Sequence, residues 1–218
     1  MMSAQVVSKP WRPKSIGRLG PLLLVLLAAL LASACTSFGP GGPAEVEMLE
    51  SGGFRITEEA RFGLGIRSDF REAMGLLEDE RYDEGIDLLI ELTEVAPHAI
   101  SAQINLGIAY AKIDELDQAA GSLERALALN SEHPAAHNEL GIVRRRQGRF
   151  EEARTHYEAA LEFYPGFHLA LRNLAILCDM YLSDSDCAID YYERYAAAVP
   201  EDHKVSMWIA DLRSRVGE

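Results

Sequence analysis

The sequence lacks most of the motifs that enzymes and nucleic-acid-binding proteins require. It has three cysteines and no Cys-x-x-Cys pair, which argues against a thiol redox centre. It contains neither a glycine-rich phosphate loop nor a nucleophile elbow. Basic residues number 21 against 34 acidic ones, for a net charge of −13, whereas nucleic-acid binding relies on Lys and Arg to neutralise phosphates. We therefore expect neither an enzyme nor a nucleic-acid partner.

Metal ligands are also sparse. His133 and His137 are four residues apart, but Pro134 starts a helix between them, and a shared metal would need both in one helix. No third ligand accompanies them. We expect no metal, no cofactor and no small-molecule substrate. The aromatic group at 191, 192 and 195 is explained by packing, with a ligand stack as the alternative.

The N-terminus lacks an apolar run long enough to span a membrane, which takes about 18–20 residues. A shorter run, 21–31, follows basic residues and leads into Ala-Ser-Ala-Cys35. This pattern resembles a bacterial lipoprotein signal, which implies that 1–34 is removed and that Cys35 carries the lipid. Ala32 departs from the usual Leu, so cleavage near Ala34 that leaves a free Cys35 is the alternative. Thr36 in place of Asp implies the outer membrane of a diderm bacterium, facing the periplasm.

The rest of the chain has an internal period. Leu106-Gly107 recurs 34 positions later as Leu140-Gly141, and Ala and Pro recur at matching places. NLGIAY at 105–110, with Ala119 following, resembles the tetratricopeptide repeat family. The resemblance implies an all-α, right-handed solenoid of about four helix-turn-helix units. We place the units at 66–99, 100–133, 134–167 and 168–202, the last with one extra residue.

Three segments flank the units. We expect a flexible Gly/Pro-rich tether at 35–53 and a lead-in at 54–65. A capping helix and tail should occupy 203–218, because a terminal unit needs one face for its neighbour and one for water. Removing 1–34, with four basic and no acidic residues, takes the net charge from −13 to −17.

The two remaining cysteines form an even pair in an oxidising compartment. Cys178 falls near the end of the first helix of the fourth unit and Cys187 near the start of the second, so the hairpin should bring them together. We expect a disulfide, with two buried free thiols as the alternative.

A groove along the first helices of the units is the expected binding surface. Its polar and cationic side chains suit backbone carbonyls or carboxylates of a partner. They are Asn105, Lys112, Asn138, Arg145, Arg172 and Asn173. The alternative is that Arg144–Arg146 is a solvated helix end. The carboxylate clamp of chaperone-binding family members is not expected, because Phe70 and Met74 stand where it carries Lys and Asn.

Together these features predict a lipid-anchored scaffold without catalytic activity. It would bind a periplasmic or envelope protein, and it resembles pilotin-type lipoproteins, adaptors of cell-wall hydrolases and proteins of TonB-type systems. The alternative is an enzyme or small-ligand binder whose site the sequence does not reveal.

Overall fold

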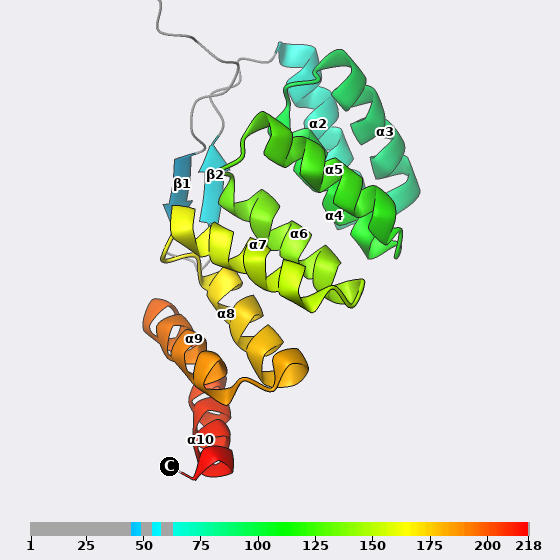
Figure 1. Ribbon diagram of the computed structural model, residues 1–218. Coiled ribbons are helices and arrows are strands. Elements are labelled where there is room, and N and C mark those ends of the chain that lie inside the picture. Colours follow the sequence, from blue (N-terminus) through cyan, green and yellow to red (C-terminus); the bar gives the residue numbers. More distant parts are fainter. Residues whose placement is uncertain (1–44, 49–53, 58–62, 218) are drawn as a thin grey trace, which may run out of the picture. The chain divides into compact units, whose positions relative to one another are not determined.

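The computed structural model describes residues 45–48, 54–57 and 63–217. The leader and Cys35 lie outside these ranges, as does most of the expected tether. The described part holds two short strands, nine α-helices and one π-helix (Figure 1). They are β1 (Glu45–Met48), β2 (Phe54–Thr57), α2 (Leu64–Glu78), α3 (Tyr82–Val95), α4 (Ile100–Lys112), α5 (Leu116–Leu129), α6 (Pro134–Arg146), α7 (Phe150–Phe163), α8 (His168–Leu177), η2 (Cys178–Leu182), α9 (Ser185–Ala198) and α10 (Lys204–Val216).

The helices pack as consecutive hairpins, each against the next (Figure 1). We call α2, α4, α6 and α8 the A helices, and α3, α5, α7 and α9 the B helices. Each A helix packs on the B helix that follows it, and each of the first three B helices packs on the next A helix. The last helix, α10, packs on α9. This arrangement confirms the expected helical solenoid.

The two strands were not predicted. β1 and β2 pair antiparallel, with Val46 opposite Ile56, inside segments expected to be tether and lead-in. The sequence carried the signal, because polar and apolar residues alternate through Glu45–Met48 and Phe54–Thr57. Two glycines lie between these runs, as is common for hairpin connections. The repeats themselves are all-α, and the two strands lie before them in the sequence.

The turn inside each hairpin places one residue in the left-handed region. These residues are Glu80, Asp114, Gly148 and Ser183, with φ of 60°, 66°, 76° and 54°. A backbone bond then closes each A helix, for example from the Arg149 N–H to the Arg144 carbonyl at 2.9 Å. Such bonds satisfy carbonyls that a helix end would otherwise leave unpaired. The turns therefore repeat with the sequence period.

The fourth hairpin absorbs its extra residue in the π-helix η2. Its closing bond runs from the Asp184 N–H to the Cys178 carbonyl, which spans one residue more than in the other hairpins. A single π turn accommodates one added residue without breaking the helix. Cys178, at the start of η2, forms a disulfide with Cys187 of α9, with sulfur atoms 2.00 Å apart.

Close helix crossings depend on small residues. A Cβ built on Gly107 would lie 2.6 Å from the Leu123 Cγ and 3.1 Å from the Ala119 carbonyl oxygen. In the second hairpin the glycine lies on the A helix and the alanine on the B helix. In the first hairpin this order is reversed, with Ala73 on the A helix and Gly85 on the B helix. A Cβ on Gly85 would lie 2.6 Å from the Leu77 side chain. The first unit thus keeps the close crossing despite its weaker match to the repeat pattern.

Candidate protein-binding surface

We call the surface formed by the A helices the A-helix wall. In addition to their own B helices, α4 contacts α6 and α6 contacts α8. Every residue that the sequence predicted for the groove lies on an A helix. Their binding role stays a prediction, whereas the structure shows how each of them is placed.

The three predicted asparagines are largely engaged within the protein. Asn138 is 1% exposed, accepts a bond from the Asn173 amide and donates one to the Glu139 carboxylate, both at 2.9 Å. The Asn105 amide donates to the Ser101 carbonyl of its own helix at 2.8 Å. The expectation that Asn138 is presented to a partner is therefore wrong, since its side chain joins α6 to α8 instead.

Glu139 is a member of this network that the sequence did not single out. Burial raises the pKa of its carboxyl above the ordinary value, although the Asn138 amide and the charge of Lys112 act in the opposite direction. It occupies the position equivalent to Asn105 and Asn173 in the repeat. Its alignment with these two polar positions is the sequence feature that could have identified Glu139 as a member of the network.

The predicted cations differ in their freedom. Arg145 is half-buried, donates to the Tyr181 hydroxyl at 3.2 Å and has its guanidinium 5.5 Å from the centre of that ring. Lys112 and Arg172 are exposed. These two side chains are thus available to a partner, and Arg145 is partly committed to packing.

Arg144 and Arg146 are not a solvated helix end. The Arg144 side chain is 9% exposed, pairs with Glu124 of α5, and lies 3.4 Å from Glu152 of α7. Arg146 pairs with Asp114 at 2.8 Å and also bonds the Ala111 carbonyl. These two arginines tie the second hairpin to the third, which corrects the solvated interpretation for both.

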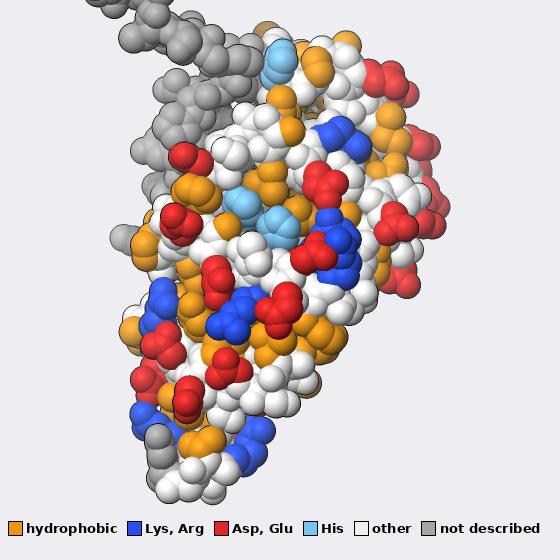
Figure 2. Space-filling model, viewed as in Figure 1, with side chains coloured by type: hydrophobic (Ala, Val, Ile, Leu, Met, Phe, Trp, Pro, Cys, Tyr) orange, Lys and Arg blue, Asp and Glu red, His pale blue; other side chains and the backbone are white. Residues whose placement is uncertain are grey.

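Charges are distributed unequally between the two kinds of helix. Figure 2 shows acidic side chains along α3, where Asp83, Glu84, Asp87, Glu91 and Glu94 are exposed. Most arginines among residues 63–217 are paired with carboxylates: Arg81, Arg144, Arg146, Arg149, Arg154, Arg194, Arg213 and Arg215. Within the same residues, six exposed cations have no carboxylate within 4.0 Å: Arg67, Arg71, Lys112, Arg125, Arg172 and Lys204. Four of the six lie on A helices, whereas Arg125 lies on α5 and Lys204 on α10.

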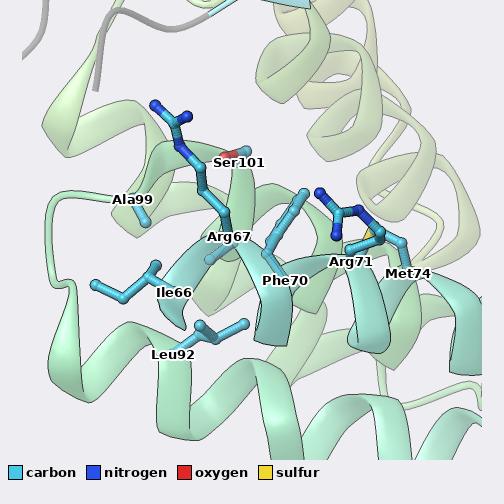
Figure 3. Close-up of a pocket in the computed structure, with 9 residues that line it drawn as sticks. Ile66, Arg67, Phe70, Arg71, Met74, Leu92, Ala99 and Ser101 are labelled. Atoms are coloured by element: carbon cyan, nitrogen blue, oxygen red, sulfur yellow. The ribbon is translucent and has the colours of Figure 1, made fainter. Parts of the chain in front are cut away.

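The structure also contains a pocket at the start of the wall that we did not predict from the sequence. It lies between α2, α3 and the beginning of α4 and has a volume of about 380 Å³ (Figure 3). Phe70 and Met74, which exclude the carboxylate clamp, are two of its lining residues. The spacing of Ile66, Phe70 and Met74 along one helix face was the available signal.

One segment of the chain matches a known protein family. Residues 105–166 match the family described as tetratricopeptide repeat. This segment is similar to tetratricopeptide repeats. No curated protein sequence matches the chain significantly.

Solved structures with the same fold support the repeat assignment. PilF of Pseudomonas aeruginosa superposes with a TM-score of 0.63 at 21% identity, over 69% of this chain and 68% of that one. MamA of Desulfovibrio magneticus RS-1 gives 0.62 at 18% identity, over 71% and 87%. An O-GlcNAc transferase of Thermobaculum terrenum gives 0.57 at 23% identity, over 61% of this chain but only 26% of the enzyme. At these identities the likeness concerns the fold.

Histidines cluster at the crossing of the third repeat. The Nδ1 atoms of His137 and His156 are 3.2 Å apart, so one must be a neutral acceptor for the other. The His133 Nδ1 accepts the Ala136 N–H at 3.3 Å and thereby caps α6. Among the described residues no group of three or more His, Cys, Asp or Glu is arranged to hold a metal ion. The imidazoles bond to groups within the protein, and burial favours their neutral form.

We expect acid to weaken this repeat. Burial lowers the pKa of His133 to about 4, and burial together with the neighbouring His137 lowers that of His156 to about 4. Both groups have lower pKa values folded than unfolded, so their contribution is present above pH 6.5 and is lost as the pH falls toward 4. For His133, on the order of 2 kcal/mol should disappear between pH 6.5 and 4.5. The melting temperature should fall over that range.

The variant His133→Asn isolates this effect. Asn is a good N-cap without a titrating group, so the variant should lose part of the slope of melting temperature against pH. The exposed His98→Asn is the matched control and should keep the slope. Circular dichroism melts from pH 7.5 to 4.5 measure both. An unchanged slope in His133→Asn would show that the buried imidazole does not set the acid response.

Proposed function

We propose that this protein is a lipid-anchored scaffold of the bacterial envelope that binds another protein along its A-helix wall. The repeat fold supports a protein-binding role. The observation that carries the proposal is a set of exposed cations on the wall, Arg67, Arg71, Lys112 and Arg172, which have no carboxylate within 4.0 Å among residues 63–217 of a strongly acidic chain. Guanidinium and ammonium groups of this kind bind carboxylates of a partner.

The envelope location is the second part of the proposal. It is supported by the leader-like sequence, in which basic residues, an apolar run and Ala-Ser-Ala precede Cys35. None of the helices in the described residues is long and apolar enough to span a membrane. We propose that lipid on Cys35 holds the protein at the outer membrane, facing the periplasm. There it would support a pilus or secretion, cell-wall or TonB-type assembly.

Removing the proposed lipid site should release the protein. Cys35→Ser leaves no thiol to acylate, so the protein should move from the membrane fraction to the soluble fraction of lysed cells. Ser37→Ala is a control that keeps the thiol and should remain with membranes. Fractionation and labelling with radioactive palmitate measure the change. If Cys35→Ser stays with membranes as the wild type does, the anchoring proposal is wrong.

Charge reversal on the wall should weaken partner capture. Lys112→Glu combined with Arg172→Glu replaces two exposed cations, and repulsion should lower the affinity for an acidic surface by about tenfold or more. Arg194→Glu with Arg213→Glu changes the net charge equally but lies on α9 and α10. Crosslinking in intact cells, followed by quantitative mass spectrometry, compares the two. Equal yields from both double variants would exclude the wall as the binding surface.

A further inference from the structure

The pocket at the start of the A-helix wall has an apolar floor. Ile66, Phe70 and Met74 come from α2 and Leu92 comes from α3, while Ala99 directly precedes α4 and Ala102 lies in its first turn. The first three are half-buried and pack on the core cluster that contains Leu92 and Ala102. The floor is thus a part of the hydrophobic core that remains accessible.

The rim of the same pocket carries two guanidinium groups. Arg67 and Arg71 line the pocket, and in Figure 3 the Phe70 ring lies between their side chains. Both are exposed, and neither has a carboxylate within 4.0 Å among residues 63–217. In a chain of net charge −13, two neighbouring cations that no carboxylate of residues 63–217 neutralises form a positive site. Such a site favours a carboxylate ligand, which each guanidinium can bind in a two-pronged contact.

The size of the pocket limits what it can hold. A volume of about 380 Å³ lies at the lower end of the range for ligand pockets, roughly 300–1,000 Å³. That space suits one or two large side chains. Protein interfaces often concentrate their affinity in such anchor pockets, where a large apolar group is removed from water. The combination of apolar floor and cationic rim therefore selects an apolar side chain with a carboxylate beside it.

We propose that this pocket anchors the partner through a bulky apolar side chain, flanked by Asp or Glu, in an extended acidic segment. Phe70 and Met74 contact the apolar side chain, while Arg67 and Arg71 bind the flanking carboxylates. This inference rests on the proposed scaffold function and specifies the chemistry of the segment that is bound. Affinity for the segment falls with ionic strength, because two of the contacts are between exposed charges.

A random dodecapeptide library displayed on phage, selected on the full 218-residue chain, tests the proposal. The selected consensus is then synthesised with a fluorescent label and its affinity measured by polarisation. We expect enriched peptides to carry Phe, Leu, Met or Trp within about two residues of Asp or Glu. Arg67→Glu with Arg71→Glu should weaken binding at least about tenfold, which is about 1.4 kcal/mol. The control Arg194→Glu with Arg213→Glu should stay within about twofold of wild type.

A second variant tests the floor. Phe70→Ala removes the ring between the two arginines and should weaken binding of the consensus peptide by a similar factor. Its melting curve shows whether the first repeat is still folded. The double arginine variant changes exposed side chains only, so it decides the question if Phe70→Ala fails to fold.

Several outcomes would overturn the proposal. These are the absence of any enriched peptide, enrichment of basic or purely polar peptides, and an affinity that the arginine reversal leaves unchanged. Selection of peptides that match residues 44–51 of this chain would point to an internal occupant and also overturn it. Equal crosslinking of the envelope partner by wild type and the arginine variant would overturn the pocket while leaving the scaffold role intact. A wild-type chain that captures no envelope protein would instead refute the scaffold role, and the peptide selection still decides the pocket.

Discussion

Gly141→Leu is expected to destabilise the protein by about 3 kcal/mol or more. A Cβ at Gly141 would lie 2.6 Å from Cε1 and 2.7 Å from Cδ1 of Tyr157, and the Tyr157 ring is 0% exposed. The ring has no free space to enter, so α6 and α7 must separate. For a chain of this size the melting temperature should fall by roughly 6–12 °C. Thermal melts followed by circular dichroism measure the loss.

Gly121 supplies the matched control for this prediction. It also lies inside a helix, α5, but a Cβ there would meet only the flexible Arg125 side chain, at 3.6 Å. Gly121→Ala should therefore raise stability slightly, by up to about 1 kcal/mol, because Ala is the better helix former. Gly141→Ala should lower it despite the same gain in propensity. If Gly141→Leu melts at the wild-type temperature, the close crossing of α6 and α7 is not real.

Arg144→Ala should lower the free energy of unfolding by about 2–3 kcal/mol. The substitution removes a side chain that is 9% exposed and that connects α5, α6 and α7 through Glu124, Glu152 and Gln147. This loss of stability should be smaller than when a fully buried charge is left without a partner. Glu124 and Glu152 are about half exposed, so water can hydrate them in the variant. Urea unfolding measures the difference.

Arg149→Ala tests whether burial causes this effect. Arg149 pairs with the same Glu152 at 2.6 Å, but its side chain is 47% exposed. Exposed pairs contribute about 0–1 kcal/mol, so this control should unfold close to wild type. Equal losses in the two variants would show that the position of Arg144 between three helices has no special importance. Arg144→Lys should recover little, since a single ammonium cannot reach three partners at once.

Much of the fold could be predicted from the sequence because the repeat imposes local rules. Leu106-Gly107 and Leu140-Gly141 mark crossings where the two helices approach too closely for a side chain at the glycine. The structure places both glycines at such crossings. The one-residue excess of the fourth unit was also visible, although its location in η2 was not. A π turn leaves no compositional mark, whereas a glycine crossing does.

The candidate surface was predicted less well because the repeat period places residues on a helix without fixing their partners. Asn138 and Arg144 are polar in sequence but buried in the structure, since Asn173 and Glu124, distant along the chain, complete their bonds. The pocket was missed for a similar reason. Leu92 and Ala102 close it from other helices, and no local pattern relates them to Phe70.

The wide turn of η2 has a consequence for what the wall offers to a bound chain. Counting by the repeat period, Met180 occupies the place held by Lys112 and Arg146 in the two preceding units, and its side chain is 70% exposed. Tyr181 beside it is 41% exposed. A thioether and a phenol thus stand in the fourth unit where the two preceding units carry cations. The two outer units of the wall therefore differ from the middle ones in the chemistry that they would offer to an elongated ligand.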